Sequence, residues 1–110
     1  MDIRTKRVYD PVEESDGYRV LVDRVWPRGM AKEKARIDAW PKEIAPSKEL
    51  RQWFDHDPDK WEEFRERYAE ELAEHKEHLQ ELADMALSAP LTLVFSSRET
   101  RYNNAVALKE

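Results

Sequence analysis

The sequence predicts one small α/β domain over residues 1–110, with a short, mostly parallel or mixed sheet covered by helices, one of them long and acidic. Three observations predict this class. Segments of strand character alternate with segments of helical period, which is typical of helices packed on a sheet. The chain is long enough for one core and too short for two ordinary domains. Its 40% content of hydrophobic residues argues against wholesale disorder.

Four segments have strand character. The second is the clearest, because Tyr18, Val20 and Val22 alternate with other residues at the period of a strand. The third contains Pro41, which donates no ladder hydrogen bond and restricts a strand to a sheet edge. The fourth is a short apolar run, as expected of a buried strand. Their ranges are 3–9, 18–26, 37–44 and 91–95.

Helical segments fill most of the remaining chain. Ser47 is a good N-cap for a short amphipathic helix, and Asp57 followed by Pro58 starts a long one. The long segment carries apolar residues at steps of three or four, so we expect its aromatic stripe to pack on the sheet and its glutamates to face water. Without a break this helix would span roughly 40 Å, which is longer than a domain of this size can fully cover. We therefore expect a break near residues 75–78. The predicted helices are 31–35, 47–54, 57–88 and 102–109.

Charge is distributed unevenly. The net charge is −5, and residues 57–84 alone contribute 11 acidic and 4 basic side chains. An acidic chain makes nucleic acid an unlikely partner, whereas the mildly basic remainder can attract a small anion.

The composition also bears on location. The chain has no cysteine, which excludes disulfides and thiolate chemistry and suits a reducing compartment. No apolar stretch approaches a membrane span, and residues 1–7 lack the apolar run of a signal peptide. We therefore expect a cytoplasmic protein with no membrane partner.

Arginine and hydroxyl side chains follow two of the predicted strands. If these strands are parallel neighbours, their carboxyl ends meet in one pocket, and arginine binds phosphate, sulfate or carboxylate there. The alternative is that the arginines pair with nearby carboxylates and that the tryptophan belongs to the core. The candidate ligand-binding residues of this pocket are Arg24, Trp26, Arg28, Ser96, Ser97 and Arg98.

A second cluster lies where two predicted helices meet, at Arg51, Asp55, His56 and Asp57. A histidine flanked by carboxylates can act as a general acid or base near neutral pH. His56 is therefore a candidate catalytic residue, with Asp23 as the other titrating candidate at the strand ends. The alternative is that Asp57 is a cap and His56 an exposed loop residue.

Other motifs are weak or missing. His75 and His78 lie one helical turn apart, but no third ligand is marked, so we expect surface pairs with Glu71 and Glu74 and no metal site. No glycine-rich phosphate loop is present and no cofactor is expected. Two other classes of function stay open: a protein-interaction module that uses the acidic helix, and single-stranded nucleic-acid binding. The oligomeric state is open as well.

Several blocks of sequence resemble the YeaO-like family, a bacterial and archaeal group that carries domain of unknown function 488. The blocks are 22–29, 45–54, 56–64 and 93–96, followed by Asn103, and they span nearly the whole chain. The resemblance implies an intracellular α/β protein with no settled activity. The chain departs from the family pattern at Val25 and at Ser97, and Ser97 belongs to the proposed pocket. The family's polar residues correspond to Asp23, Arg24, Arg28, Gly29, Ser47, Arg51, His56, Asp57, Arg98 and Asn103.

Overall fold

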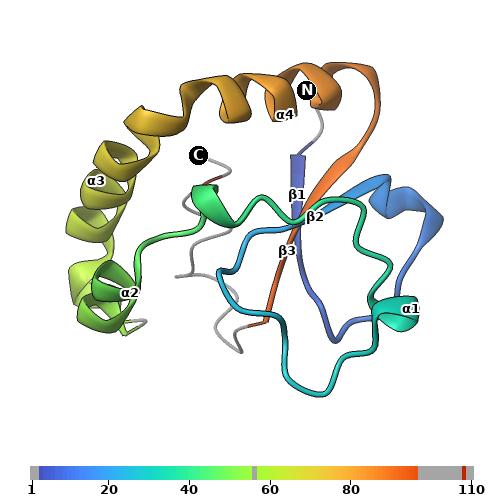
Figure 1. Cartoon of the computed structure of the whole chain (residues 1–110), viewed down its shortest axis with the longest axis horizontal. Helices are drawn as coiled ribbons and strands as arrows, with labels where there is room; N and C mark the ends of the chain where they lie inside the picture. Colours follow the sequence, from blue (N-terminus) through green and yellow to red (C-terminus); the bar gives the residue numbers. More distant parts are fainter. Residues whose placement is uncertain (1–2, 56, 97–107, 109–110) are drawn as a thin grey trace.

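A computed structural model describes residues 3–55, 57–96 and 108. Within this part of the chain, three parallel strands form one open sheet in the order β1-β3-β2 (Figure 1). The strands are β1 (Ile3–Arg7), β2 (Tyr18–Leu21) and β3 (Leu91–Phe95). The α/β class is therefore confirmed, and the sheet is parallel.

Strand β3 comes last in the chain and lies at the centre of the sheet. All five of its residues are buried, as expected of a strand that pairs on both edges and is covered on both faces. Leu91 is in register with Ile3 of β1 and with Tyr18 of β2. Both edge strands therefore start level with β3, and β1 also ends level with it, whereas β2 ends one residue earlier, opposite Val94.

The first two strands are shorter than the sequence predicts. Strand β3 ends at Phe95. The last hydrogen bond on the β1 side runs from the Val8 amide to the Phe95 carbonyl, at 2.7 Å. On the other side the Val22 amide donates to the Val94 carbonyl at 3.0 Å, just after β2 has ended. Residues beyond these points have no ladder partner within the described part of the chain, so apolar alternation alone overestimated both strands.

The strand predicted over 37–44 is wrong. Its first half does lie along the outer edge of β2, where Ala39 forms an isolated bridge with Val20. Pro41 cannot extend this pairing because it has no N–H, and the chain turns into a 3₁₀ helix, η2 (Lys42–Ile44).

The helices follow the sequence more closely. The Ser47 hydroxyl accepts a hydrogen bond from the Leu50 amide at 3.1 Å, which confirms it as an N-cap. The predicted break is present slightly earlier than expected, as a single 3₁₀ turn. The helical elements are η1 (Glu14–Asp16), α1 (Lys32–Ala35), α2 (Lys48–Phe54), η3 (Pro58–Lys60), α3 (Trp61–Leu72), η4 (Ala73–His75) and α4 (Lys76–Ser88).

The aromatic stripe of α3 packs differently from the prediction. Phe64 stacks on Phe54 of α2 with ring centroids 4.1 Å apart, and Tyr68 joins the same buried cluster. The stripe thus covers α2 rather than the sheet. Tyr68 links this cluster to the sheet layer, because its hydroxyl donates a hydrogen bond to the Ile44 carbonyl. Burial raises the pKa of Tyr68 well above its usual value, so the hydroxyl stays a donor.

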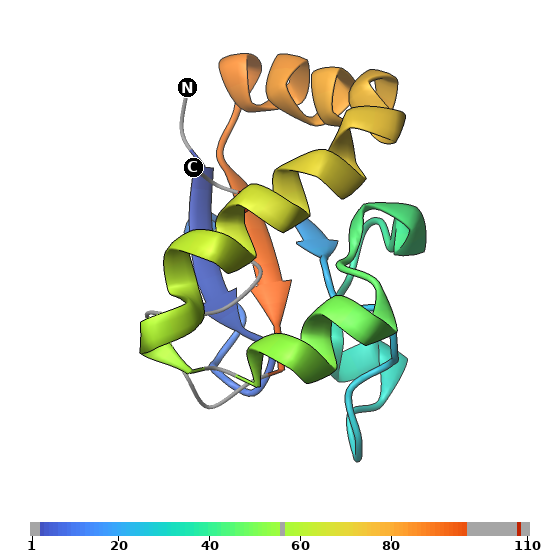
Figure 2. The ribbon, with the colours of Figure 1, turned by 90° about the vertical axis from the view of Figure 1, so that its left-hand side faces the viewer.

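The two faces of the sheet have different character. On one face, Val20, Val22, Leu93 and their neighbours form the main apolar cluster, and α4 packs against it (Figure 2). On the other face, Val8, Ala35 and Val94 form a small cluster beside polar side chains. None of the helices in the described part of the chain combines the length and apolar character that a membrane span needs.

We expect the two glycines to differ sharply when changed to alanine. Gly17 has φ of 65°, and an added Cβ would lie 2.1 Å from the Pro90 carbonyl oxygen, just before β3. Gly29 has φ of 75° but nothing within 4 Å of that position. Chemical denaturation should show a loss above about 4 kcal/mol for Gly17→Ala and about 1–2 kcal/mol for Gly29→Ala. Equal losses would contradict a close approach at Gly17.

Candidate functional site

The carboxyl edge of the sheet brings two separate parts of the chain together. Strands β2 and β3 are parallel neighbours, which was the condition for a shared site at their ends. Asp23 follows β2 and Ser96 follows β3. One carboxylate oxygen of Asp23 accepts hydrogen bonds from the Ser96 amide at 2.8 Å and from the Ser96 hydroxyl at 2.7 Å. The structure therefore joins the two strand ends through Asp23.

This arrangement defines what Ser96 can offer to a ligand. Its hydroxyl proton points to Asp23, so its oxygen is left as an acceptor. The Asp23 carbonyl accepts from the indole N–H of Trp40 at 2.7 Å, which holds the aspartate from a second side. Asp23 and Ser96 thus present acceptors at this edge, and an anion needs its donors from other residues.

Arg24 is exposed, and its guanidinium donates to two backbone carbonyls, which the sequence did not predict. Its Nε donates to the Pro46 carbonyl at 3.3 Å and its Nη2 to the Ala45 carbonyl at 3.2 Å. The guanidinium therefore holds the segment that leads into α2. Its remaining N–H groups are the only ones it can offer to a ligand at the sheet edge.

Trp26 and Arg28 lie in the loop after β2. The Trp26 indole N–H donates to the Met30 carbonyl at 2.7 Å, and its ring meets Trp40 edge to face with centroids 5.4 Å apart. The Tyr9 hydroxyl donates to the Arg28 carbonyl at 2.8 Å, which ties this loop to the end of β1. The Arg28 side chain is exposed and makes no hydrogen bond or ion pair with described residues.

The other predicted site residues divide into two groups. Arg51 is exposed on α2, and Asp57 caps η3 by accepting from the Asp59 amide at 3.0 Å. The structure does not join Arg51 to the Asp23–Ser96 pair by any hydrogen bond or ion pair that it describes. Outside the described residues lie His56, Ser97, Arg98, Asn103 and the helix predicted over 102–109.

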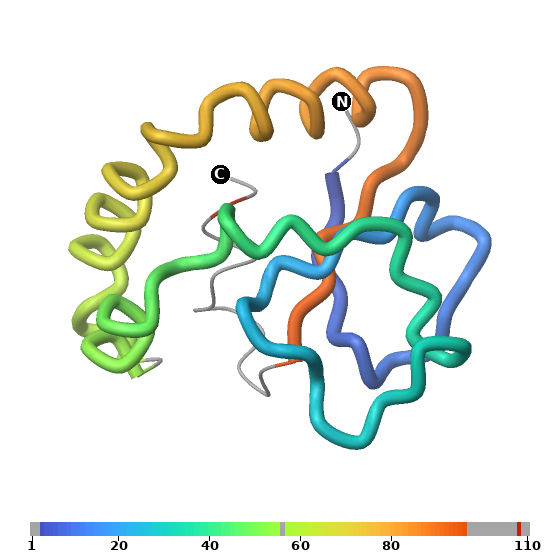
Figure 3. Tube along the Cα trace, viewed as in Figure 1, coloured from blue at the N-terminus to red at the C-terminus, as the bar shows by residue number. Residues whose placement is uncertain are grey.

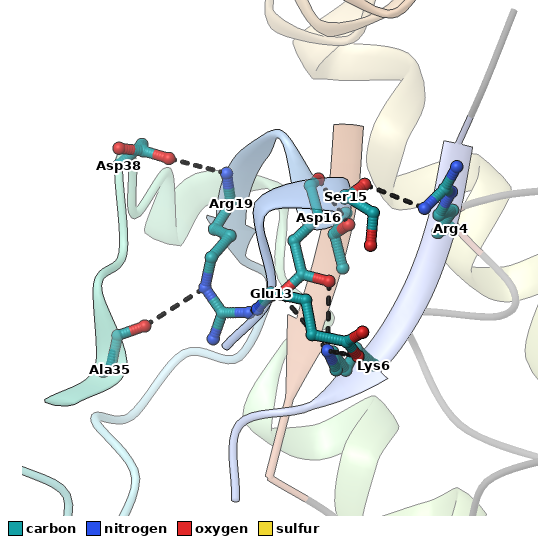
Figure 4. Close-up of polar contacts among 9 residues, drawn as sticks. Arg4, Lys6, Glu13, Ser15, Asp16, Arg19, Ala35 and Asp38 are labelled. Atoms are coloured by element: carbon teal, nitrogen blue, oxygen red, sulfur yellow. Dashed lines mark hydrogen bonds and ion pairs between the residues drawn. The ribbon is translucent and has the colours of Figure 1, made fainter. Parts of the chain in front are cut away.

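A buried charge cluster on the polar face of the sheet was not predicted (Figure 4). The Asp16 carboxylate accepts from Lys6 Nζ at 3.0 Å and from Arg19 Nη1 at 2.6 Å. Arg19 is 2% exposed and Asp16 4% exposed. Lys6 also pairs with the exposed Glu13 at 2.9 Å. No short-range pattern joins Asp16 to Lys6, which lies ten positions away on β1.

The cluster reaches all three strands. Lys6 lies on β1 and Arg19 on β2, and the hydroxyl of Thr92 on β3 donates to the Asp16 carbonyl at 2.7 Å. Arg19 Nε donates to the Ala35 carbonyl at 3.1 Å, whereas its buried Nη2 has no partner among the described residues. One loop residue thus connects the whole sheet.

The cluster shifts two pKa values in opposite directions. Burial alone would raise the pKa of Asp16, but the Glu13 amide and the cations of Lys6 and Arg19 outweigh it and lower that pKa. Burial alone would lower the pKa of Lys6, but the carboxylates of Glu13 and Asp16 outweigh it and raise that pKa. Both groups are therefore charged over the ordinary pH range.

The acidic helix borders a polar hollow of about 690 Å³ between α3 and the segment before α2. Glu71 is anchored there, because its carboxylate accepts from the Ser47 amide at 2.8 Å and the Ser47 hydroxyl at 2.6 Å. His78 pairs with Glu43 at 2.9 Å, so the expected pairs of His75 and His78 with Glu71 and Glu74 are not the contacts described. In the described part of the chain, no three acidic or histidine side chains are grouped to hold a metal ion. The hollow is lined by Glu43, Glu49, Glu70, Glu71, Glu74, Arg67 and His75, among others.

Together, the fold and the site define a small parallel α/β protein whose two neighbouring strand ends are joined at a polar edge. The family model described as the inactive DUF488-N3 subclade matches residues 2–110. The Escherichia coli protein YeaO is 50% identical over 110 residues, which covers all of this chain and 96% of that protein. Protein Rv3073c of Mycobacterium tuberculosis is 41% identical over 108 residues, which covers 98% of this chain and 91% of that protein.

The chain belongs to the YeaO-like DUF488 family, which confirms the resemblance found in its sequence blocks. No solved structure matches the chain at a significant level.

We expect Asp16→Asn to weaken the fold by about 3–5 kcal/mol at neutral pH, because it leaves the buried Arg19 and the partly buried Lys6 without their shared carboxylate. Because the pKa of Asp16 is lowered in the folded state, its contribution is present above pH about 4 and is lost as pH falls through the folded value. The difference between the native chain and the variant in urea unfolding should therefore shrink in acid.

Glu13→Gln is the matched control for this prediction. Glu13 contacts the same lysine, but its side chain is 63% exposed, so its loss should cost less than about 1 kcal/mol. An Asp16→Asn variant as stable as this control, or a difference that stays constant in acid, would refute the role of the cluster.

Proposed function

We propose that this protein is a non-catalytic binding protein that holds a small phosphate- or carboxylate-bearing ligand at the carboxyl edge of its sheet. The observation that carries the proposal is the pairing of Asp23 with Ser96 across two parallel strand ends. Ligands of parallel α/β sheets collect beyond this edge. The description of the subclade as inactive supports binding over catalysis.

In the proposal, Arg28 supplies the first cation for the ligand. Its guanidinium is exposed and has no partner among the described residues, so binding an anion breaks no existing contact there. Arg98 follows Ser96 by two positions in the sequence and supplies a second guanidinium in the proposal. Arginine suits such ligands because its planar fork binds two oxygens of a phosphate or carboxylate together.

The acceptors at the same edge narrow the ligand class. The Ser96 hydroxyl donates its proton to Asp23 and is left as an acceptor, so it favours a ligand that carries hydroxyl groups beside its anionic group. A sugar phosphate has both features, because its sugar hydroxyls can donate hydrogen bonds while its phosphate binds arginine. We include a cytoplasmic location in the proposal, because such ligands are intracellular metabolites and a chain without cysteine suits a reducing compartment.

A second candidate function is docking of a basic segment of a partner protein on the acidic helix. The hollow beside α3 favours it, because several of its glutamates, Glu49, Glu70 and Glu74 among them, are exposed. Such a contact would rely on charge and would weaken steeply as salt is added.

The first proposal predicts a specific NMR response to glucose 6-phosphate. The indole signal of Trp26 and the amide of Ser96 should shift together, since one reports the loop of Arg28 and the other the end of β3. Arg28→Ala should weaken binding roughly tenfold, the loss of one charged hydrogen bond. Arg98→Ala should weaken it similarly.

Arg65→Ala is the control, since Arg65 is an exposed arginine on α3, away from this edge. The same titration should include inorganic phosphate, a short single-stranded oligonucleotide and a lysine-rich peptide. Shifts confined to α3 with the peptide would favour the second function. No response at Trp26 or Ser96 to any anion, or equal weakening by Arg28→Ala and Arg65→Ala, would overturn the first.

A further inference from the structure

Tyr9 is a large aromatic residue that the fold leaves open to solvent. It is 43% exposed and lies in the turn that directly follows β1. The Asp10 amide donates to the Arg7 carbonyl at 3.1 Å and closes this turn. Tyr9 belongs to none of the three apolar clusters that the described residues form. Core packing therefore does not explain why an aromatic ring stands at this edge of the sheet.

Two contacts fix the ring of Tyr9 in place. Its hydroxyl donates a hydrogen bond to the Arg28 carbonyl at 2.8 Å. The guanidinium carbon of Arg7 lies over one face of the ring, 5.2 Å from its centroid. With its hydroxyl engaged and one face covered, the ring offers its other face for contact. A ring that is already fixed loses little conformational freedom when a ligand packs on it.

Tyr9 follows β1 at the point where Ser96 follows β3. Arg7 and Phe95 are paired in register, and the Val8 amide donates to the Phe95 carbonyl at 2.7 Å. The residues that come directly after this bonded pair are Tyr9 and Ser96. The turn after β1 therefore starts beside the acceptor that the proposed ligand uses at the end of β3.

The loop of Arg28 approaches the same end of the sheet from β2. In Figure 3, the blue turn after β1 and the cyan loop between β2 and α1 lie at one end of the strands. The hydrogen bond from Tyr9 to Arg28 joins this turn to this loop. Each strand end thus contributes a side chain of different chemistry: the ring of Tyr9, the guanidinium of Arg28 and the hydroxyl of Ser96.

We propose that Tyr9 stacks on an aromatic base and that the ligand of this edge is a nucleoside monophosphate. The inference rests on the proposed binding function and narrows its ligand class. Arg28 suits a phosphate, the Ser96 oxygen accepts from sugar hydroxyls, and the ring of Tyr9 suits a planar base. Ribose 5-phosphate carries the first two groups, whereas a nucleoside monophosphate carries all three.

Charge favours a single nucleotide over a nucleic-acid strand. The chain has a net charge of −5, and residues 57–84 contribute 11 acidic and 4 basic side chains. A strand brings one more negative charge with every nucleotide, so the acidic chain repels it increasingly. Stacking itself does not select the base, because every base has a π face.

A comparison of two ligands tests this inference on the unchanged chain. In NMR titrations, ribose 5-phosphate and adenosine 5′-monophosphate should both shift the Trp26 indole and Ser96 amide signals. The nucleotide should bind roughly tenfold more tightly, because only the nucleotide gains the stacking contact. The adenine H2 and H8 signals should move upfield on binding, since they then lie above an aromatic ring.

Substitutions at Tyr9 assign the preference to its ring. Tyr9→Leu should reduce the affinity for the nucleotide to that for ribose 5-phosphate and abolish the upfield shifts. Tyr9→Phe should keep the tenfold preference, because the ring remains. Tyr18→Leu is the matched control, since Tyr18 lies at the amino end of β2, the opposite end of the sheet. This control should leave both affinities unchanged.

The outcomes separate this inference from the function on which it rests. Equal affinity for the two ligands, with shifts at Trp26 and Ser96, would overturn the stacking role of Tyr9 and leave the binding function intact. Equal weakening of both ligands by Tyr9→Leu would also overturn it, because Tyr9 would then only hold the loop of Arg28. No shift with either ligand would overturn both proposals.

Discussion

The structure depends on one buried aspartate that contacts all three strands. Asp16 pairs with Lys6 of β1 and Arg19 of β2, and its carbonyl accepts from Thr92 of β3. Two cations on one buried sheet face are unfavourable unless a negative charge compensates them. Removing the carboxylate would leave the buried Arg19 of β2 without a compensating charge and Lys6 of β1 with only the exposed Glu13. The register of this small sheet is therefore fixed by a loop residue as well as by its ladder hydrogen bonds.

That register positions the candidate site at the other end of the sheet. Because the three strands start level, β2 and β3 end within one residue of each other, and Asp23 reaches Ser96. The amino ends carry the loop of Asp16, and the carboxyl ends carry the Asp23–Ser96 pair. The loop of Asp16, which stabilises the fold, and the proposed binding site thus lie at different ends of one sheet. A variant at Arg28 can therefore affect binding without affecting the charge cluster.

Local sequence signals predicted those features that depend on neighbouring residues. Three predictions of this kind were correct: the cap at Ser47, the buried strand β3 and the break in the long acidic helix. Each follows from a short-range pattern in the sequence. The meeting of the ends of β2 and β3 was also anticipated, although the strand order itself needed the structure.

Features that depend on distant contacts were missed. Asp16 and Thr92 are 76 positions apart, and no spacing rule connects them. The role of Asp23 as an acceptor for Ser96 was not anticipated, and neither were the hydrogen bonds of Arg24 to backbone carbonyls, because sequence cannot locate these partners. The aromatic stripe of α3 was correctly identified as apolar but assigned to the wrong partner, since periodicity gives a face and not its neighbour.

Native-state hydrogen exchange tests most directly whether the Asp16 cluster holds the sheet together. The Glu13 amide donates to the Asp16 carboxylate at 3.1 Å and belongs to no strand. If the cluster opens only when the sheet unfolds, this amide exchanges with a free energy of opening within about 1 kcal/mol of that of the β3 amides. Rapid exchange of the Glu13 amide while β3 stays protected would show that the loop opens on its own, and would contradict the role assigned to Asp16.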